Sequence, residues 1–90
     1  MNQPVEDLRE MLLAVTRSLV DQPDKLRIDS VCEDETVAFW VYAHSQDAGT
    51  LIGANGRTAR ALRIILQANA VKLQLKPVLN ICALSDIPTS

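Results

Sequence analysis

The sequence predicts a single α+β domain in which helices cover one face of a three-stranded sheet. Three observations lead to this expectation. In residues 4–20 and 57–72, apolar side chains recur every three or four positions, as in an amphipathic helix. Residues 25–31, 36–43 and 78–84 form shorter apolar or alternating runs that are typical of strands. The chain has 90 residues, which suits one small domain, with a core expected over about 4–84.

The first helix is expected over residues 4–20. Pro4 suits a helix start, and Glu6 and Asp7 lie in the first turn, where the positive end of the helix dipole favours acids. Residues 21–24 contain Asp and Pro and are expected to end the helix. The stripe that faces the core consists of Val5, Leu8, Leu12, Val15 and Leu19.

Residues 25–31 and 36–43 are expected to pair as an antiparallel hairpin, because the polar link of residues 33–35 between them is short. Side chains along a strand alternate between its two faces. Trp40 and Tyr42 therefore share one face of the second strand, and the other face carries Val37, Phe39, Val41 and Ala43.

The second half of the chain predicts two helices and a strand. Ser45 is expected to cap a short helix over residues 46–52, which the two glycines of residues 53–56 then break. A long helix follows over about 57–72, and a strand over 78–84 begins after Lys76-Pro77. The tail from Asp86 is expected to fray. The core face of the long helix consists of Ala59, Leu62, Ile65, Leu66 and Ala70.

The charges are divided unevenly along the chain, whose net charge is −2. Residues 1–47 contain ten acidic and four basic residues, whereas residues 48–85 contain five basic residues and no acid. This division predicts a local basic surface on an acidic body. The overall acidity limits non-specific binding to polyanions.

Side chains suited to a metal centre or to catalysis are few. The chain has one histidine, His44, and its two cysteines, Cys32 and Cys82, lie far apart, whereas a zinc centre needs about four ligands. We expect two buried, reduced strand cysteines, with no metal, no cofactor and no catalytic activity. The chain begins with Met and shows neither a secretory signal nor an apolar run that could span a membrane, so we expect a cytoplasmic protein.

The segment LIGANGRTAR, residues 51–60, places two glycines at the start of the long helix. Glycine lets the backbone turn sharply and lets a ligand approach it closely. The first turn of the helix carries Arg57 and Arg60 and no acid, against the preference set by the helix dipole. Backbone N–H groups at a helix start, together with arginines, suit the oxygens of a phosphate. The alternative is that the glycines only shape a helix corner and the arginines are solvated.

The motif Leu-Ile-Gly-x-x-Gly-Arg-Thr, followed by Ala-Leu-Arg and set after two strands and before one, resembles the KH domain. Over residues 4–84 the chain resembles the short bacterial single-KH proteins of the KhpA type. This resemblance implies the type II KH order, α-β-β-α-α-β, and a non-catalytic RNA chaperone or post-transcriptional regulator that binds single-stranded RNA. It implies a loop that clamps the RNA backbone, flanking arginines, an apolar floor, and an opposite wall from the second strand. The loop would be Gly53, Ala54, Asn55 and Gly56, the arginines Arg57 and Arg60, and the floor Leu51 and Ile52.

Two features leave the strength and mode of binding open. The family often has Lys or Arg inside the loop, where this chain has Ala54 and Asn55, so we expect weak binding with a shallow salt dependence. Trp40 and Tyr42 could stack on bases, but KH grooves rarely rely on aromatic stacking, and packing against a loop is the favoured interpretation. Replacing both loop glycines by Asp is expected to keep the fold and to abolish RNA binding.

The long helix has a second apolar stripe roughly opposite its core face, which we call the outer stripe. It is either a scatter of surface residues or a protein contact. The resemblance implies self-association or pairing with a larger Jag-type KH protein. The alternative function is therefore a KH-fold interaction, or dimerisation, module with weak or lost RNA affinity; a metabolite-binding regulatory domain is a third possibility. The outer stripe consists of Ala61, Ile64, Ala68 and Val71.

Overall fold

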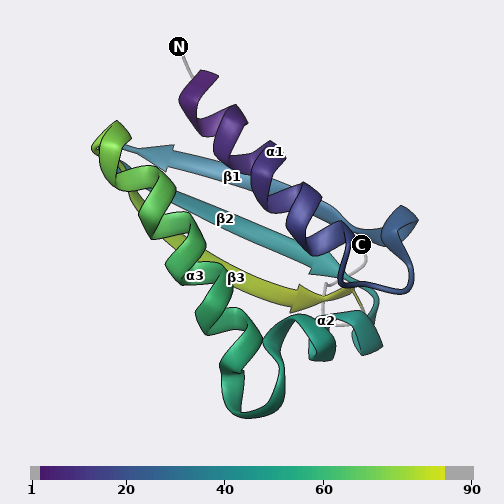
Figure 1. Cartoon of the computed structure of the whole chain (residues 1–90). Coiled ribbons are helices and arrows are strands. Elements are labelled where there is room, and N and C mark those ends of the chain that lie inside the picture. Colours follow the sequence, from purple (N-terminus) through teal and green to yellow (C-terminus); the bar gives the residue numbers. More distant parts are fainter. Residues whose placement is uncertain (1–2, 85–90) are drawn as a thin grey trace.

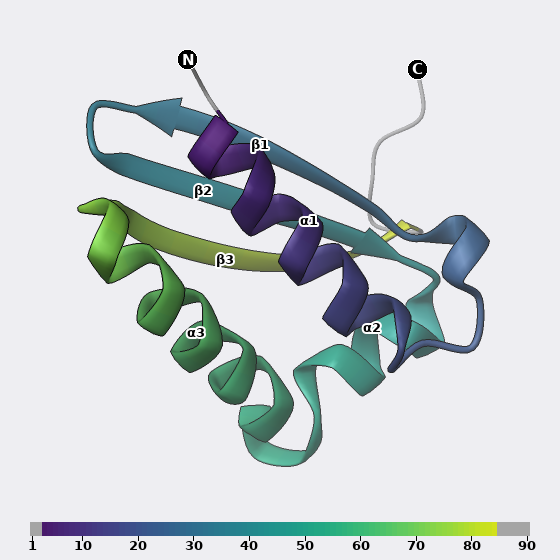
Figure 2. The same cartoon turned by 45° about the horizontal axis from the view of Figure 1, so that its top comes forward.

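The structure, a computed structural model, describes residues 3–84 and shows two layers, with helices on one face of a sheet (Figures 1 and 2). Strand β2 lies in the centre of the sheet, antiparallel to β1 and parallel to β3. Helices α1 and α3 cover one face, and α2 lies beyond the ends of β2 and β3. The elements are α1 (Gln3–Arg17), β1 (Arg27–Glu33), β2 (Thr36–Ala43), α2 (Ser45–Ile52), α3 (Arg57–Ala70) and β3 (Lys76–Ala83). The predicted α+β class, element order and hairpin are confirmed.

The core lies between the sheet and the helices. In β2 the alternation is as predicted: Val37, Phe39 and Val41 are fully buried, whereas Trp40, on the opposite face, is 37% exposed. No helix of residues 3–84 covers this opposite face of the sheet (Figure 2). The helices contribute mainly leucines to the core, and its members from α1 and α3 are Val5, Leu8, Leu12, Leu62, Leu66 and Ala70.

Helix α1 ends at Arg17, three residues earlier than predicted. The N–H groups of Ser18 and Leu19 donate to carbonyls only three residues back, so the chain tightens and leaves the helical path. Leu19, expected in the core stripe, is 41% exposed as a result. The next element also shifts, because Pro23–Lys25 form a 3₁₀ turn and β1 begins at Arg27.

Helix α3 ends at Ala70 and a 3₁₀ turn, Val71–Leu73, follows, where one continuous helix was predicted. Ile65, expected in the core, is 38% exposed. It lies about a quarter turn from the line of buried residues on this helix, at the flank between the core face and the outer stripe. The outer stripe itself is exposed, as predicted.

The start of α2 is fixed by two side chains, His44 and Asp47, which differ from the predicted cap, Ser45. The cap is His44 rather than Ser45: its Nδ1 accepts the Gln46 N–H at 3.3 Å. The Asp47 carboxylate is 3% exposed and accepts the backbone N–H groups of Asp21 and Gln22, each at 2.9 Å. These bonds fasten α2 to the segment after α1 and thereby set the direction in which α2 leads into the next turn.

The expectation that both cysteines are buried is wrong. Cys82 is half-buried, but Cys32 is exposed, because it lies near the end of the edge strand β1. Within residues 3–84, no helix is long and apolar enough to cross a bilayer. The described part of the chain also holds no group of three or more His, Cys, Asp or Glu side chains placed to bind a metal ion. The expected fraying of the tail from Asp86 lies outside the described residues.

Candidate nucleic-acid interface

Residues 53–56 form a tight corner between α2 and α3, which we call the Gly-x-x-Gly corner. It projects away from the sheet in both views of the molecule (Figures 1 and 2). The chain reverses here through three residues with positive φ, namely Gly53 at 78°, Asn55 at 57° and Gly56 at 73°. The side chains of Ala54 and Asn55 are exposed. The corner therefore presents mostly backbone to the outside.

The two glycines of the corner have different roles. Gly53 combines φ 78° with ψ 171°, a backbone region that is essentially limited to glycine. A Cβ there would lie 2.4 Å from Thr58 Oγ1 and 2.8 Å from Thr58 N. A Cβ at Gly56 would meet nothing within 4 Å. Gly53 thus fits the packing inside the corner, and Asp at Gly53 is expected to strain the fold, whereas Asp at Gly56 meets no neighbour.

Some backbone N–H groups of the corner are paired and others are open. Gly53 N–H donates to the Gly49 carbonyl at 2.8 Å, and Gly56 N–H donates to the Gly53 carbonyl at 3.1 Å. The N–H groups of Ala54 and Asn55 have no acceptor within the described residues. Donors that can meet an anionic oxygen therefore lie at the tip of the corner, earlier in the chain than the helix start predicted from the sequence.

Arg57 and Arg60 lie on the first turn of α3, directly after the corner, and both are exposed. Residues three apart on a helix are neighbours on its surface. Neither arginine forms an ion pair within residues 3–84, where the ion pairs involve Arg9, Arg27 and Lys76 instead. Two guanidinium groups are thus available beside the open amides.

The predicted apolar floor is divided between an accessible and an inaccessible residue. Ile52 is 42% exposed at the end of α2, whereas Leu51 is fully buried in the core. Leu51 therefore supports the corner from beneath, and only Ile52 can touch a ligand in this conformation.

A cavity of about 390 Å³, which we call the corner groove, runs from the corner to β3. Its wall is formed mainly by β3, and β2, the strand expected to form the wall, contributes Trp40. The reason is the sheet order: β3 is the edge strand, and the helix pair packs beside it. The lining residues are Trp40, Ile52, Gly56, Ala59, Arg63, Leu79, Asn80, Ile81 and Cys82.

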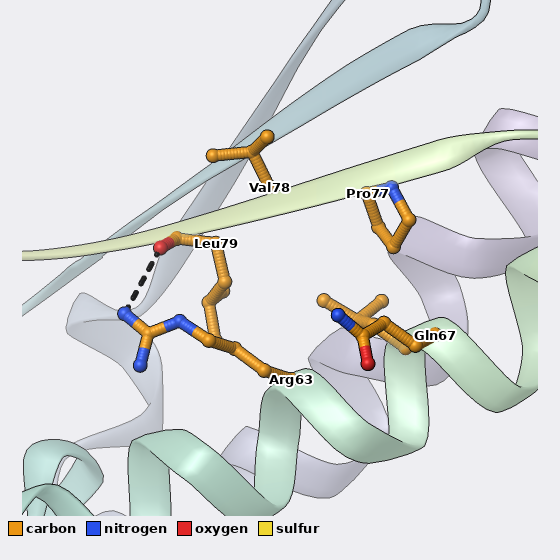
Figure 3. Close-up of a pocket in the computed structure, with 6 residues that line it drawn as sticks. Arg63, Gln67, Pro77, Val78 and Leu79 are labelled. Carbon is orange, nitrogen blue, oxygen red and sulfur yellow. Dashed lines mark hydrogen bonds between the residues drawn. The ribbon is translucent and has the colours of Figure 1, made fainter.

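A second cavity, of about 330 Å³, adjoins the corner groove and shares Arg63 and Leu79 with it (Figure 3). The Arg63 guanidinium donates to the Leu79 carbonyl at 3.3 Å. That carbonyl lies on the outer edge of β3, and backbone groups two residues apart in a strand point the same way. The N–H and C=O of Ile81 therefore also face the corner groove, where a base edge could pair with them.

Arg63 is not among the site residues that the sequence predicts. A signal was present, because Arg57, Arg60 and Arg63 follow one another at three-residue steps. What the sequence does not show is that Arg63 lies between α3 and the edge of β3. It thereby extends the basic surface from the corner into the groove.

Comparison with known proteins gives a consistent result. The model of the family described as "KhpA/KhpB, KH domain" matches residues 9–81. The chain is 31% identical over 74 residues to RNA-binding protein KhpA of Clostridium perfringens, covering 82% of this chain and 99% of that protein. It is 32% identical over 71 residues to RNA-binding protein KhpA of Bacillus subtilis, covering 79% and 88%. It is 35% identical over 74 residues to RNA-binding protein KhpA of Aquifex aeolicus, covering 82% and 94%. No solved structure matches the chain.

Proposed function

Because the chain belongs to the KhpA/KhpB KH-domain family, we propose that it binds single-stranded RNA through the Gly-x-x-Gly corner and the groove beside it. Membership confirms the resemblance inferred from the sequence. Membership of this family also agrees with the observed order of elements, which is that of a type II KH domain. The RNA-binding names of the curated relatives support the same class of ligand. The role that fits such a module is that of a non-catalytic RNA chaperone or post-transcriptional regulator.

The observation that carries this proposal is the open backbone of the corner. The Ala54 and Asn55 N–H groups point to no acceptor within residues 3–84, and no side chain at Gly56 covers the backbone. Phosphodiester oxygens can approach such amides, and Arg57 and Arg60 supply charge-assisted hydrogen bonds. The sugar-phosphate backbone is thereby held at the corner, while the bases enter the groove and meet the edge of β3.

Binding is expected to be weak, because the corner itself carries no charge. Each phosphate that a protein cation neutralises adds about 0.7 to the slope of log affinity against log salt for single strands. With Ala54 and Asn55 in the loop, that contribution at the corner itself comes from the flanking arginines. The acidic residues elsewhere in the chain reduce non-specific binding further.

A charge placed at Ala54 tests the position of the RNA backbone. Ala54 is exposed and has no positive φ, so substitution there adds no backbone strain. Ala54→Lys should bind a short single-stranded RNA more tightly than wild type, with a salt slope steeper by about 0.7. Ala54→Gln is the matched control, since it has a comparable polar chain without charge. Fluorescence anisotropy at several salt concentrations measures both quantities; equal slopes for the two variants would contradict the proposed contact.

A second candidate function is protein association through α3, for which the exposed apolar surface is the specific observation. Ile64 is 59% exposed, Val71 is 71% exposed, and Ile65 at the flank adds to the same surface. An apolar surface of this kind is typical of a protein contact. The partner would be a second copy of the chain or a larger Jag-type KH protein, in keeping with a family model that spans KhpA and KhpB.

Ile64→Glu should weaken this association at least tenfold, because a carboxylate would be desolvated in the contact. Gln46→Glu adds the same charge on α2, away from the outer stripe, and should leave association unchanged. Sedimentation equilibrium over a wide concentration range measures both variants. A wild-type chain that stays monomeric at high concentration and captures no partner would count against this second function.

A further inference from the structure

Trp40 lies on the face of the sheet that no helix of residues 3–84 covers, and it also lines the corner groove. It pairs in register with Asn80 of β3, and both residues line the same cavity as Gly56 and Arg63. The groove therefore continues from the Gly-x-x-Gly corner over the edge strand to an indole ring that is 37% exposed. A ligand that enters at the corner and follows the groove reaches this ring.

The neighbours of Trp40 leave its ring available. On the β1 side its partner is Asp29, whose carboxylate is paired with Arg27 at 3.1 Å, so the nearby negative charge is largely compensated. The same Arg27 guanidinium lies over the Tyr42 ring, 5.0 Å from its centre. Of the two aromatic residues on this face, Tyr42 is thus already covered by a cation, whereas Trp40 is open toward the groove.

Given the RNA binding proposed above, we propose that a nucleobase of the bound strand stacks on Trp40 and that the Asn80 amide hydrogen-bonds its edge. Every base has a π-face, so stacking adds affinity without demanding a sequence. The mixture of groups also suits a base: the indole is planar and apolar, the Asn80 amide both donates and accepts, and Arg63 brings positive charge. Stacking would supply part of the affinity that the uncharged loop lacks.

Trp40 is the only tryptophan of the chain, so its emission reports on this site alone. The full chain is titrated with a short, dye-labelled, single-stranded RNA of mixed sequence, and binding is followed by the anisotropy of the dye. The indole emission is followed in a parallel titration with the unlabelled RNA. We expect the emission to be quenched in step with binding.

Three variants separate stacking from packing. Trp40→Phe keeps a ring and should retain most of the affinity, whereas Trp40→Leu removes it and should bind roughly tenfold more weakly. Tyr42→Leu removes the aromatic ring that is already covered and should bind like wild type. Thermal unfolding of each variant shows whether the fold is kept. If Trp40→Leu does not fold, quenching of the wild-type emission by RNA is the deciding measurement.

The outcomes distinguish this inference from the proposed function. RNA binding with constant Trp40 emission, and with equal affinity for wild type and Trp40→Leu, would overturn the stacking and leave RNA binding at the corner intact. An absence of any RNA binding would overturn both. An emission change that follows protein concentration and not RNA would assign this face to a second copy of the chain and overturn the inference.

Discussion

Replacing Gly56 by Asp is expected to reduce RNA affinity by tenfold or more, whereas replacing it by Asn should reduce affinity far less. A side chain at this position points into open space, so neither variant displaces a neighbour. Asp and Asn both tolerate positive φ and have nearly the same shape, so the backbone strain is about equal in the two variants. The difference is the carboxylate, which would repel a bound phosphodiester by about 1–4 kcal/mol at a distance of a few ångströms.

Anisotropy titrations of the two Gly56 variants with the same RNA measure this difference, and unfolding curves confirm that both are folded. The difference should shrink as salt is raised, because exposed charges are screened. If Gly56→Asp and Gly56→Asn bind with the same affinity at low salt, no phosphate lies close to Gly56, and the corner does not hold the RNA backbone.

Replacing Gly53 by Ala is expected to destabilise the fold by about 2–4 kcal/mol, because the methyl group adds backbone strain and a clash. The clash involves the backbone N of Thr58, which cannot turn aside as a long side chain could. Gly49→Ala is the matched control within the same helix pair. Its Cβ meets nothing within 4 Å, and it should stabilise α2 by about 0.5–1 kcal/mol.

Urea unfolding of these two alanine variants and the wild type measures the effect as changes in midpoint. Opposite shifts of the midpoint are the expected result. Equal midpoints for Gly53→Ala and Gly49→Ala would show that the corner adopts another conformation in solution, and the roles assigned to its two glycines would then need revision.

The effects expected at Gly56 and Gly53 differ because the residues of the corner have different roles. Gly53 gives the corner its shape, Gly56 leaves it open, and the residues between them supply free N–H groups. The arginines at the start of α3 interact unfavourably with the helix dipole, and an anion bound there would offset this cost. Local rules broken without a packing benefit are expected at functional sites.

Much of the fold could be predicted from periodicity alone. The alternation of residues 36–43 placed Phe39 in the core and Trp40 on the opposite face, since a strand has only two faces. The helical period likewise identified Leu62 and Leu66 as buried and Ile64 as exposed. Boundaries were less accurate, because 3₁₀ turns at the ends of α1 and α3 depend on local hydrogen bonds that the apolar pattern does not encode.

The composition of the site could be predicted in part, and its architecture much less so. The corner and its arginines are contiguous in sequence, so a motif reveals them. The groove depends on contacts between distant residues: Arg63 bonds to Leu79, sixteen residues on, and Asp47 holds Asp21 and Gln22. Nothing in the local pattern of β3 shows that it pairs parallel to β2 as the edge strand. Trp40 lines the groove because its strand, β2, pairs directly with β3, the strand that forms the groove wall.

The most direct test of RNA binding at the corner is a titration of the isotope-labelled chain with a short single-stranded RNA, in which each backbone amide resonance is followed. The largest shifts are expected for Ala54 and Asn55, whose N–H groups would gain phosphate acceptors. Smaller shifts are expected along the first turn of α3 and for residues 79–82 of β3. Saturable binding that moves only amides of α1 or β1, and leaves those of residues 53–60 in place, would contradict the assignment.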